Sequence, residues 1–309
     1  MSLIFGINLS DRIYVASDTR VTYNNKGTEI YEDSVDKTAV LSDEVVCVAA
    51  GSIKLSTYLY KELKKEKFVK KGINSIKENI KPWAAKKIDE YLMSNDYSRA
   101  CLIIAGIDKS RKKIINGKEL IELVKTHQTL SEEKLFLKDA LLKGVSSKPN
   151  QPNPNPELPV SDSTVISLLS DAKNNKLEVE EAKWGQYLAY GPKGFSQSDV
   201  PKTIFGQLEF EDGNDFKNAN ILITLIKSTA GAKKLGSVGG SVVVNMINDN
   251  GISLITTTVY KRNDVTKDVS VASHTEIFEG KLKALTETGE MVELVEFHNY
   301  KCNERSSTI

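Results

Sequence analysis

Short apolar segments separated by polar turns dominate the beginning of the chain. Residues 2–10 and 13–18 are mainly apolar and are joined by the polar turn Ser10-Asp11, which predicts an antiparallel hairpin. Residues 38–41 and 45–49 repeat this pattern and predict two more strands. Between the two pairs, residues 21–36 are polar and rich in turn-forming residues, which predicts turns there.

Helical spacing of apolar residues follows these strands. Ser52 stands at a plausible helix N-cap, and apolar residues recur every three or four positions from Leu55 to Leu63. A second helix is predicted over residues 73–92, with Trp83 and Tyr91 on its buried face. A third is predicted over residues 214–233.

Two groups of apolar segments compete for the middle of the fold. One is the continuous apolar run 100–107, and the other is the series 163–170, 177–182 and 186–190. The sequence leaves open which group is native to the fold and which belongs to an insertion. Strands are also predicted at 241–247 and 252–258, because the Asn248-Asp249-Asn250-Gly251 stretch between them is typical of a hairpin.

Two regions look like additions to a core of residues 1–258. The first is an insertion within about 108–162, with a charged helical pattern at 117–142 and an extended loop at 148–159 that is rich in proline and asparagine. The second is a β-rich C-terminal extension, residues 259–309, with strand patterns at 276–278, 281–284 and 291–297.

Composition excludes several classes of function. A net charge of +1, with lysines interleaved among glutamates, gives no reason to expect nucleic acid as a partner. The sequence has no run of 18 or more apolar residues, so it predicts no membrane-spanning helix. Three widely spaced cysteines fit a reducing cytoplasm, and together with the three histidines they form no metal-ligand spacing. We therefore expect a cytoplasmic protein without a metal or other cofactor.

The chemistry suggested by the first residues is nucleophilic. If Met1 is removed, Ser2 carries a hydroxyl next to a free α-amine, which can act as the base that the hydroxyl needs. An α-amine titrates at roughly 7.7–8.0, so it can accept and return a proton near neutral pH. A nearby lysine such as Lys37 would favour the neutral amine, and a carboxylate such as Asp18 would hold the lysine.

These residues and their spacing resemble the start of a mature proteasome β-subunit or of a bacterial relative, which are N-terminal-nucleophile hydrolases. With Ser2 in place of the N-terminal threonine of that family, Gly6 and Asp18-Thr19-Arg20 align without a gap. Lys37 follows after a slightly longer loop, and the small-residue run 47–51 again keeps the spacing. The resemblance implies Ser2 as nucleophile, Asp18 as partner of Lys37, Lys37 as electrostatic activator and Gly51 as oxyanion donor.

The sequence departs from the family at Gly239-Gly240. In the family, an aspartate and a serine just before this double glycine bind the N-terminal amine, but this chain has Leu235 and Val238 at those positions. A shift by one residue would recover Ser237 as the serine but no aspartate. The departure leaves the amine without the two polar side chains that hold it in the family.

The resemblance covers roughly residues 2–107 and 163–258. It implies an α+β fold, specifically a four-layer α-β-β-α sandwich of two antiparallel sheets flanked by helices. It also implies hydrolysis of peptides or unfolded protein segments, and self-association into a ring or helical stack. The substrate-binding positions of the family correspond to apolar residues here, which predicts an apolar side chain before the cleaved bond: Val21, Val35, Ala39, Ala49 and Ile53.

Three other functions remain open at this stage. The chain could be a small-molecule amidase of the same fold, which a closed pocket would indicate. It could be a catalytically silent assembly protein, for which the missing polar pair and the C-terminal extension would be the explanation. It could also be a binding module that only shares the fold.

Overall fold

The structure is a computed structural model of the 309-residue chain. It describes residues 2–9, 12–95, 98–115, 158–171, 176–182, 186–192, 195, 215–232, 235–262, 269–273, 276–278, 281–285 and 291–300. The predicted helix at 117–142 and most of the proline-rich loop lie outside the described residues.

One antiparallel sheet has six strands in the order β11-β1-β2-β12-β13-β14. The predicted N-terminal hairpin is confirmed, with Ile4 opposite Ser17 and Asn8 opposite Ile13, and the hairpin around residues 248–251 is also present. Strand β12 pairs with β2, so a late segment of the chain lies beside the N-terminal one. The strands are β1 (Ile4–Asn8), β2 (Arg12–Asp18), β11 (Tyr187–Tyr190), β12 (Val242–Asn248), β13 (Gly251–Arg262) and β14 (Val269–Ser273).

The second sheet has five strands in the order β10-β9-β8-β7-β6, again antiparallel. Its members are β6 (Thr38–Ser42), β7 (Val45–Gly51), β8 (Arg99–Ile115), β9 (Leu158–Asp171) and β10 (Lys176–Ala182). Strand β8 pairs with both β7 and β9. The sequence had left one of the two middle groups of segments to an insertion, but β8, β9 and β10 are neighbours in one sheet.

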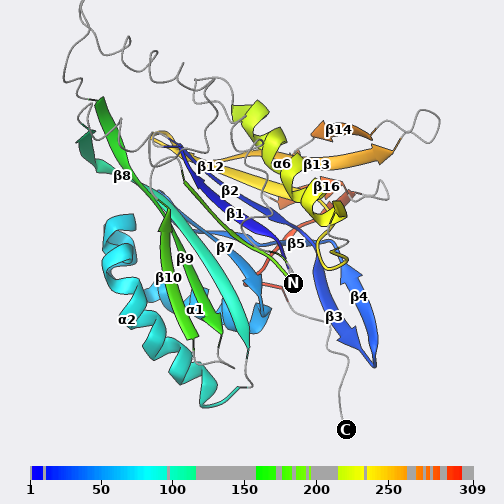
Figure 1. Ribbon diagram of the computed structural model, residues 1–309, viewed down its shortest axis with the longest axis horizontal. Helices are drawn as coiled ribbons and strands as arrows, with labels where there is room; N and C mark the ends of the chain where they lie inside the picture. Colours follow the sequence, from blue (N-terminus) through cyan, green and yellow to red (C-terminus); the bar gives the residue numbers. More distant parts are fainter. Residues whose placement is uncertain are drawn as a thin grey trace, which may run out of the picture.

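Helices cover one face of each sheet, as Figure 1 shows. Helices α1 (Ile53–Lys65) and α2 (Ile73–Leu92), with the short 3₁₀ helix η1 (Val69–Lys71), share an apolar cluster with the five-stranded sheet. Helix α6 (Asp215–Ala232) shares another with the six-stranded sheet. The predicted N-cap is confirmed, since Ser52 Oγ accepts from Leu55 N at 3.3 Å, and Trp83 and Tyr91 are buried as expected.

A third apolar cluster joins strands of both sheets and lies between them. The sheets approach closely at Gly6, where a Cβ atom would lie 2.6 Å from Val165 Cγ1 and 2.7 Å from Ile103 Cγ2. Only glycine fits there, so this position fixes how β1 sits on the facing sheet. The architecture is α+β, with mostly antiparallel strands.

The expectation of turns throughout residues 21–36 is wrong. This segment contains the hairpin of β3 (Val21–Asn25) and β4 (Thr28–Glu32), followed by β5 (Val35–Asp36). The hairpin turns at Lys26-Gly27, where both residues have positive φ, 52° and 87°, a geometry that matches the twist of paired strands. β-branched and aromatic residues on both sides of Lys26-Gly27 were the overlooked signal.

The C-terminal extension is built onto the preceding elements. Its first residues extend β13, and β14 continues the six-stranded sheet. Strands β15 (Glu276–Phe278), β16 (Lys281–Leu285) and β17 (Met291–Glu293) form a small sheet of their own. Strand β18 (Val295–Glu296) pairs in parallel with β5, directly before Lys37.

Candidate active site

Asp18 ends β2 with a fully buried carboxylate that accepts from four donors. Its Oδ1 atom accepts from Leu3 N at 3.0 Å and lies 2.9 Å from Lys37 Nζ. Its Oδ2 atom accepts from Arg20 N at 3.3 Å and from Gly239 N at 3.2 Å. Because the Leu3 amide belongs to the Ser2–Leu3 peptide bond, Asp18 positions the first residues relative to the lysine.

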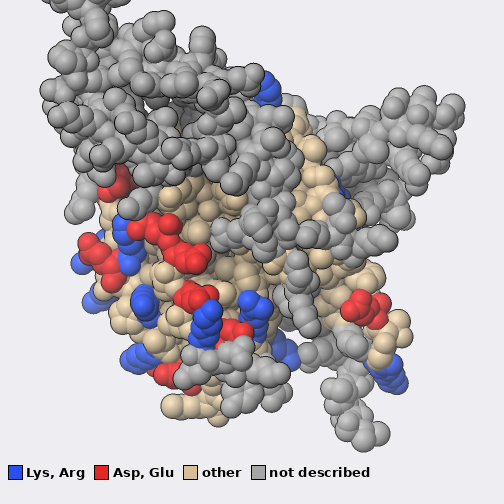
Figure 2. All heavy atoms as spheres, in the orientation of Figure 1, with Lys and Arg blue, Asp and Glu red and all other residues tan. Residues whose placement is uncertain are grey.

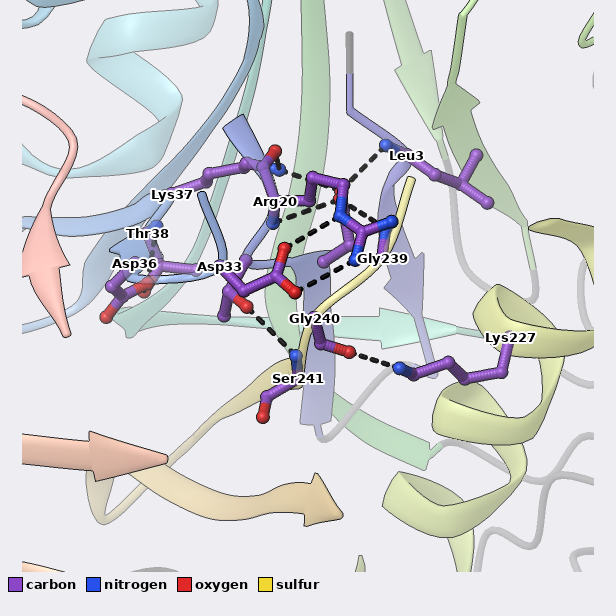
Figure 3. A network of polar contacts seen from close by, with 12 residues as sticks. Leu3, Arg20, Asp33, Asp36, Lys37, Thr38, Lys227, Gly239, Gly240 and Ser241 are labelled. Carbon is purple, nitrogen blue, oxygen red and sulfur yellow. Dashed lines mark hydrogen bonds and ion pairs between the residues drawn. The ribbon is translucent and has the colours of Figure 1, made fainter. Parts of the chain in front are cut away.

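Lys37 stands between β5 and β6 with its side chain 3% exposed. Besides the ion pair with Asp18, its Nζ atom donates to the Arg20 carbonyl oxygen at 2.6 Å (Figure 3). Burial lowers the pKa of the Lys37 ammonium, and the neighbouring Asp18 carboxylate opposes that shift.

Gly51 ends β7 in the left-handed region, with φ 91°. A Cβ atom at this position would lie 2.4 Å from the Arg99 carbonyl oxygen of the neighbouring strand. The conformation and the close approach both require glycine. They place the Gly51 backbone directly before the N-cap of α1.

Ser2, Lys37 and Gly51 line one cavity of about 250 Å³. Ser2 is 6% exposed. Four of the five predicted substrate-binding residues also line this cavity: Val21, Val35, Ala49 and Ile53. Ala39 is not among the lining residues, although it belongs to the same apolar cluster as Val21, Val35 and Ala49.

Arg20 forms a second part of the cavity wall and also fastens the turn after α6. Its guanidinium binds both oxygens of Asp33, at 2.7 and 2.9 Å (Figure 3). It also donates to the Gly236 carbonyl oxygen at 3.3 Å. A Cβ atom on Gly239 would lie 2.3 Å from Arg20 Cζ. The absence of a side chain at Gly239 therefore leaves room for the guanidinium.

The residues before this double glycine do not reach the cavity wall. Leu235 and Val238 belong to the apolar cluster of α6. Ser237 is half-buried in the turn and does not line the cavity. Neither Leu235 nor Val238 supplies the polar groups of the family, and Ser237 is not among the residues that line the cavity with Ser2, Lys37 and Gly51.

Several lining residues escaped the sequence reasoning. Phe297 comes from the C-terminal extension, and Tyr23 comes from the unpredicted β3. Thr22 Oγ1 and Ser56 Oγ are buried lining atoms without a hydrogen-bond partner among the described residues. Helical spacing placed Ser56 on α1, but no sequence signal connected Phe297 with residues near position 35.

Charge and metal chemistry add nothing to this picture. Lysines and acidic residues mix over the face shown in Figure 2. Ion pairs among the described residues include Lys77–Glu181, at 2.6 Å. Within the described residues, no group of histidine, cysteine, aspartate and glutamate could hold a metal ion. No helix in the same part of the chain is long and apolar enough to cross a membrane.

Two antiparallel sheets bring Ser2 beside Lys37 and its buried partner Asp18, an arrangement that resembles the site implied by the sequence. In agreement, residues 2–116 match the family model described as "Proteasome subunit". This N-terminal part of the chain is therefore proteasome-like. No curated protein matches the chain.

Proposed function

We propose that this chain is a peptidase that uses Ser2 as its nucleophile after removal of Met1. The observation that carries the proposal is one cavity lined by Ser2, Lys37 and Gly51, with Asp18 joining Lys37 to the Leu3 amide. The three residues come from separate segments of the chain, and the fold brings them to one place. Such convergence of a hydroxyl, a buried cation and a glycine backbone supports acyl transfer.

The reaction proceeds through an ester. The Ser2 hydroxyl oxygen attacks the carbonyl carbon of the substrate amide while its proton passes to the Ser2 α-amine. The backbone N–H of Gly51 stabilises the oxyanion of the tetrahedral intermediate. The amine then donates the proton to the leaving nitrogen, the C–N bond breaks, and water hydrolyses the resulting ester with release of the acid.

Lys37 contributes electrostatics in this scheme. Its buried ammonium disfavours protonation of the Ser2 amine and stabilises negative charge that develops on the Ser2 oxygen. Leu235 and Val238 leave the amine without the polar partners expected from the family, so its orientation depends on the Asp18–Leu3 hydrogen bond. This departure favours the silent assembly protein as the second candidate.

The cavity supports a peptide more than a small metabolite. Its volume of about 250 Å³ is below the roughly 300–1,000 Å³ of pockets that enclose whole drug-sized ligands. Walls formed by Val21, Val35 and Ala49 fit one apolar side chain, with the rest of the substrate outside. A small-molecule amidase would be expected to enclose its substrate.

The finer architecture belongs to the same proposal. We assign the helix, sheet, sheet and helix layers to the four-layer sandwich of N-terminal-nucleophile hydrolases, supported by the three apolar clusters between successive layers. We also assign a cytoplasmic location and self-association into a ring or helical stack, supported by the resemblance to proteasome subunits. Assembly would then enclose the sites and restrict them to unfolded segments.

Turnover of fluorogenic peptides tests the activity. The protein purified after removal of Met1 should cleave peptides with an apolar residue before the reporter group, and Ser2→Ala should abolish cleavage. Ser2→Thr should retain it, because threonine offers the same hydroxyl and amine. Ser94→Ala, an exposed serine after α2, is the matched control and should cleave normally. Equal rates for Ser2→Ala and the wild type would refute the proposal.

A further inference from the structure

The last described segment of the chain, residues 294–300, is bound to the core next to the candidate site. We call it the C-terminal strap. Its backbone adds to β5, with Val295 N donating to the Ser34 carbonyl oxygen at 2.8 Å and Phe297 N donating to the Asp36 carbonyl oxygen at 2.7 Å. The strap therefore continues the short strand that leads into Lys37.

Side chains fasten the strap at both ends. Leu294 packs with Val243 of the six-stranded sheet, and the Tyr300 hydroxyl donates to Glu32 Oε2 at 2.6 Å. In the middle, Thr57 Oγ1 of α1 donates to the Phe297 carbonyl oxygen at 3.3 Å. These contacts reach three separate elements, so the strap is held across the molecule rather than along one edge.

Phe297 of the strap is one of the residues that line the cavity. Its ring is 1% exposed, meets the Tyr60 ring edge-on at 5.4 Å, and lines the cavity beside Ser2. It shares the wall with Val35 and Ser56, whose hydroxyl has no partner among the described residues. The cavity is thus bounded by the C-terminal extension as well as by the segment matched by the family model.

We propose that the C-terminal strap is a specificity element, in which Phe297 sets the size of the apolar side chain that enters the cavity beside Ser2. The proposal deepens the peptidase function and rests on it for the reactive step. A large aromatic ring limits the cavity to aliphatic side chains of moderate size, and the Ser56 hydroxyl is one of the polar groups of the wall. Removing the ring enlarges the cavity toward α1.

Two peptide epoxyketones test the proposal, identical except for leucine or naphthylalanine next to the reactive group. Labelling rates are measured by intact mass for the wild type, Phe297→Ala and Phe297→Leu. We expect Phe297→Ala to shift the ratio of rates toward naphthylalanine by about tenfold or more, as for other changes in hydrophobic pockets. Phe297→Leu should shift the ratio of rates less. It keeps the test decisive if the alanine variant does not fold.

Tyr300→Phe is the matched control, because it removes the hydrogen bond to Glu32 and leaves the cavity wall intact. Its ratio of labelling rates should equal that of the wild type. If Phe297 only fastens the strap, the two Phe297 variants lose labelling by both epoxyketones to the same degree. The ratio of the two labelling rates then stays constant. That outcome overturns the proposal.

A second readout separates this proposal from the peptidase function. The corresponding non-reactive peptide amides are titrated calorimetrically into Ser2→Ala with and without Phe297→Ala. A shift of preference toward naphthylalanine in the double variant supports the role of the wall even if the wild type never reacts with the epoxyketones. Binding of neither peptide, or an unchanged preference, overturns it.

Discussion

At the scale of single residues, the account depends on the buried pair of Asp18 and Lys37. Removal of one partner from a buried ion pair costs about 3–5 kcal/mol, because the other charge loses its compensation. Lys37→Met should therefore lower the free energy of unfolding by about that amount and also abolish reaction at Ser2. Denaturant unfolding and epoxyketone labelling measure the two effects.

The double variant Lys37→Met/Asp18→Asn separates stability from chemistry. It should recover part of the lost stability, because no uncompensated carboxylate remains, yet stay unreactive. Lys65→Met, at a lysine 70% exposed, is the control and should leave both quantities unchanged. Normal labelling of Lys37→Met would remove this lysine from the proposed mechanism.

Gly51 and Gly27 offer a matched test of backbone strain. Both have positive φ, 91° and 87°, but a Cβ atom meets the Arg99 carbonyl oxygen at 2.4 Å only at Gly51, with nothing within 4 Å at Gly27. Gly27→Ala should cost roughly 1 kcal/mol of unfolding free energy from the backbone conformation alone. Gly51→Ala should cost clearly more and reduce labelling of Ser2. Equal losses would contradict the close approach.

Asp36 predicts a specific pH dependence of stability. Burial raises the pKa of its carboxyl from 3.8 to about 6, against the opposing effect of the hydrogen bonds from Thr38, and Glu296 and Lys37 contribute smaller, opposite shifts. Because the pKa of Asp36 is higher in the folded chain than in the unfolded chain, its contribution to the free energy of unfolding is fully present below about pH 4. This contribution is lost as the pH rises to about 6. At 1.36 kcal/mol per unit, the change is on the order of 3 kcal/mol.

Asp36→Asn should abolish this contribution while its oxygen still accepts from Thr38. Relative to the wild type, the variant should therefore gain on the order of 3 kcal/mol of unfolding free energy between pH 4 and pH 7. Denaturant titrations at both pH values measure the gain. Asp89→Asn, at an exposed position on α2, controls for a general charge effect. A constant difference between variant and wild type would refute the assignment.

At the scale of elements, Arg20 and Asp33 connect the β3–β4 hairpin region to the turn after α6. The pair is bidentate and its side chains are only 18% and 19% exposed. A double-mutant cycle with Arg20→Gln and Asp33→Asn should give a coupling energy of about 1–3 kcal/mol. The more exposed pair Lys77–Glu181 should give below about 1 kcal/mol. If the two pairs give equal coupling energies, the Arg20–Asp33 pair stabilises the fold no more than an exposed ion pair does.

Sequence patterns predicted the main elements because local signals were strong there. The N-terminal hairpin, the N-cap at Ser52 and helix α2 follow from periodicity and capping. The candidate site was predicted from the spacing of four residues: Ser2, Asp18, Lys37 and Gly51. The β3–β4 hairpin was missed because its strands carry many polar residues. Neither the pairing of β8 with β9 nor that of β18 with β5 has a local signal, because partners far apart in sequence determine them.

The same limit applies to the wall of the cavity. Ala39 was assigned to the wall by alignment with the family, but it does not line the cavity, although Val35 and Ala49 of the same apolar cluster do. Phe297 was seen only as the end of a strand-like pattern, and its place beside Val35 depends on the parallel pairing of the strap. Spacing predicts which residues can act together, whereas long-range strand pairing determines what surrounds them.

At the scale of the whole molecule, the proposed assembly makes a direct prediction. The purified protein should sediment as a species several times larger than one chain at micromolar concentration, because members of the resembled family enclose their sites by self-association. Analytical ultracentrifugation over a range of concentrations measures this. A monomer at every concentration would contradict the enclosed-site part of the proposal but leave the chemistry of Ser2 open.

Intact-mass analysis tests the central claim most directly. The protein purified from cells should lack Met1, and incubation with a peptide epoxyketone should add the mass of one probe, located on Ser2 by peptide mapping. Ser2→Ala should remain unmodified, and Ser94→Ala should react like the wild type. A retained Met1 would block the amine and contradict the N-terminal-nucleophile mechanism. Loss of Met1 without an adduct would contradict the peptidase and favour a silent, proteasome-like assembly protein.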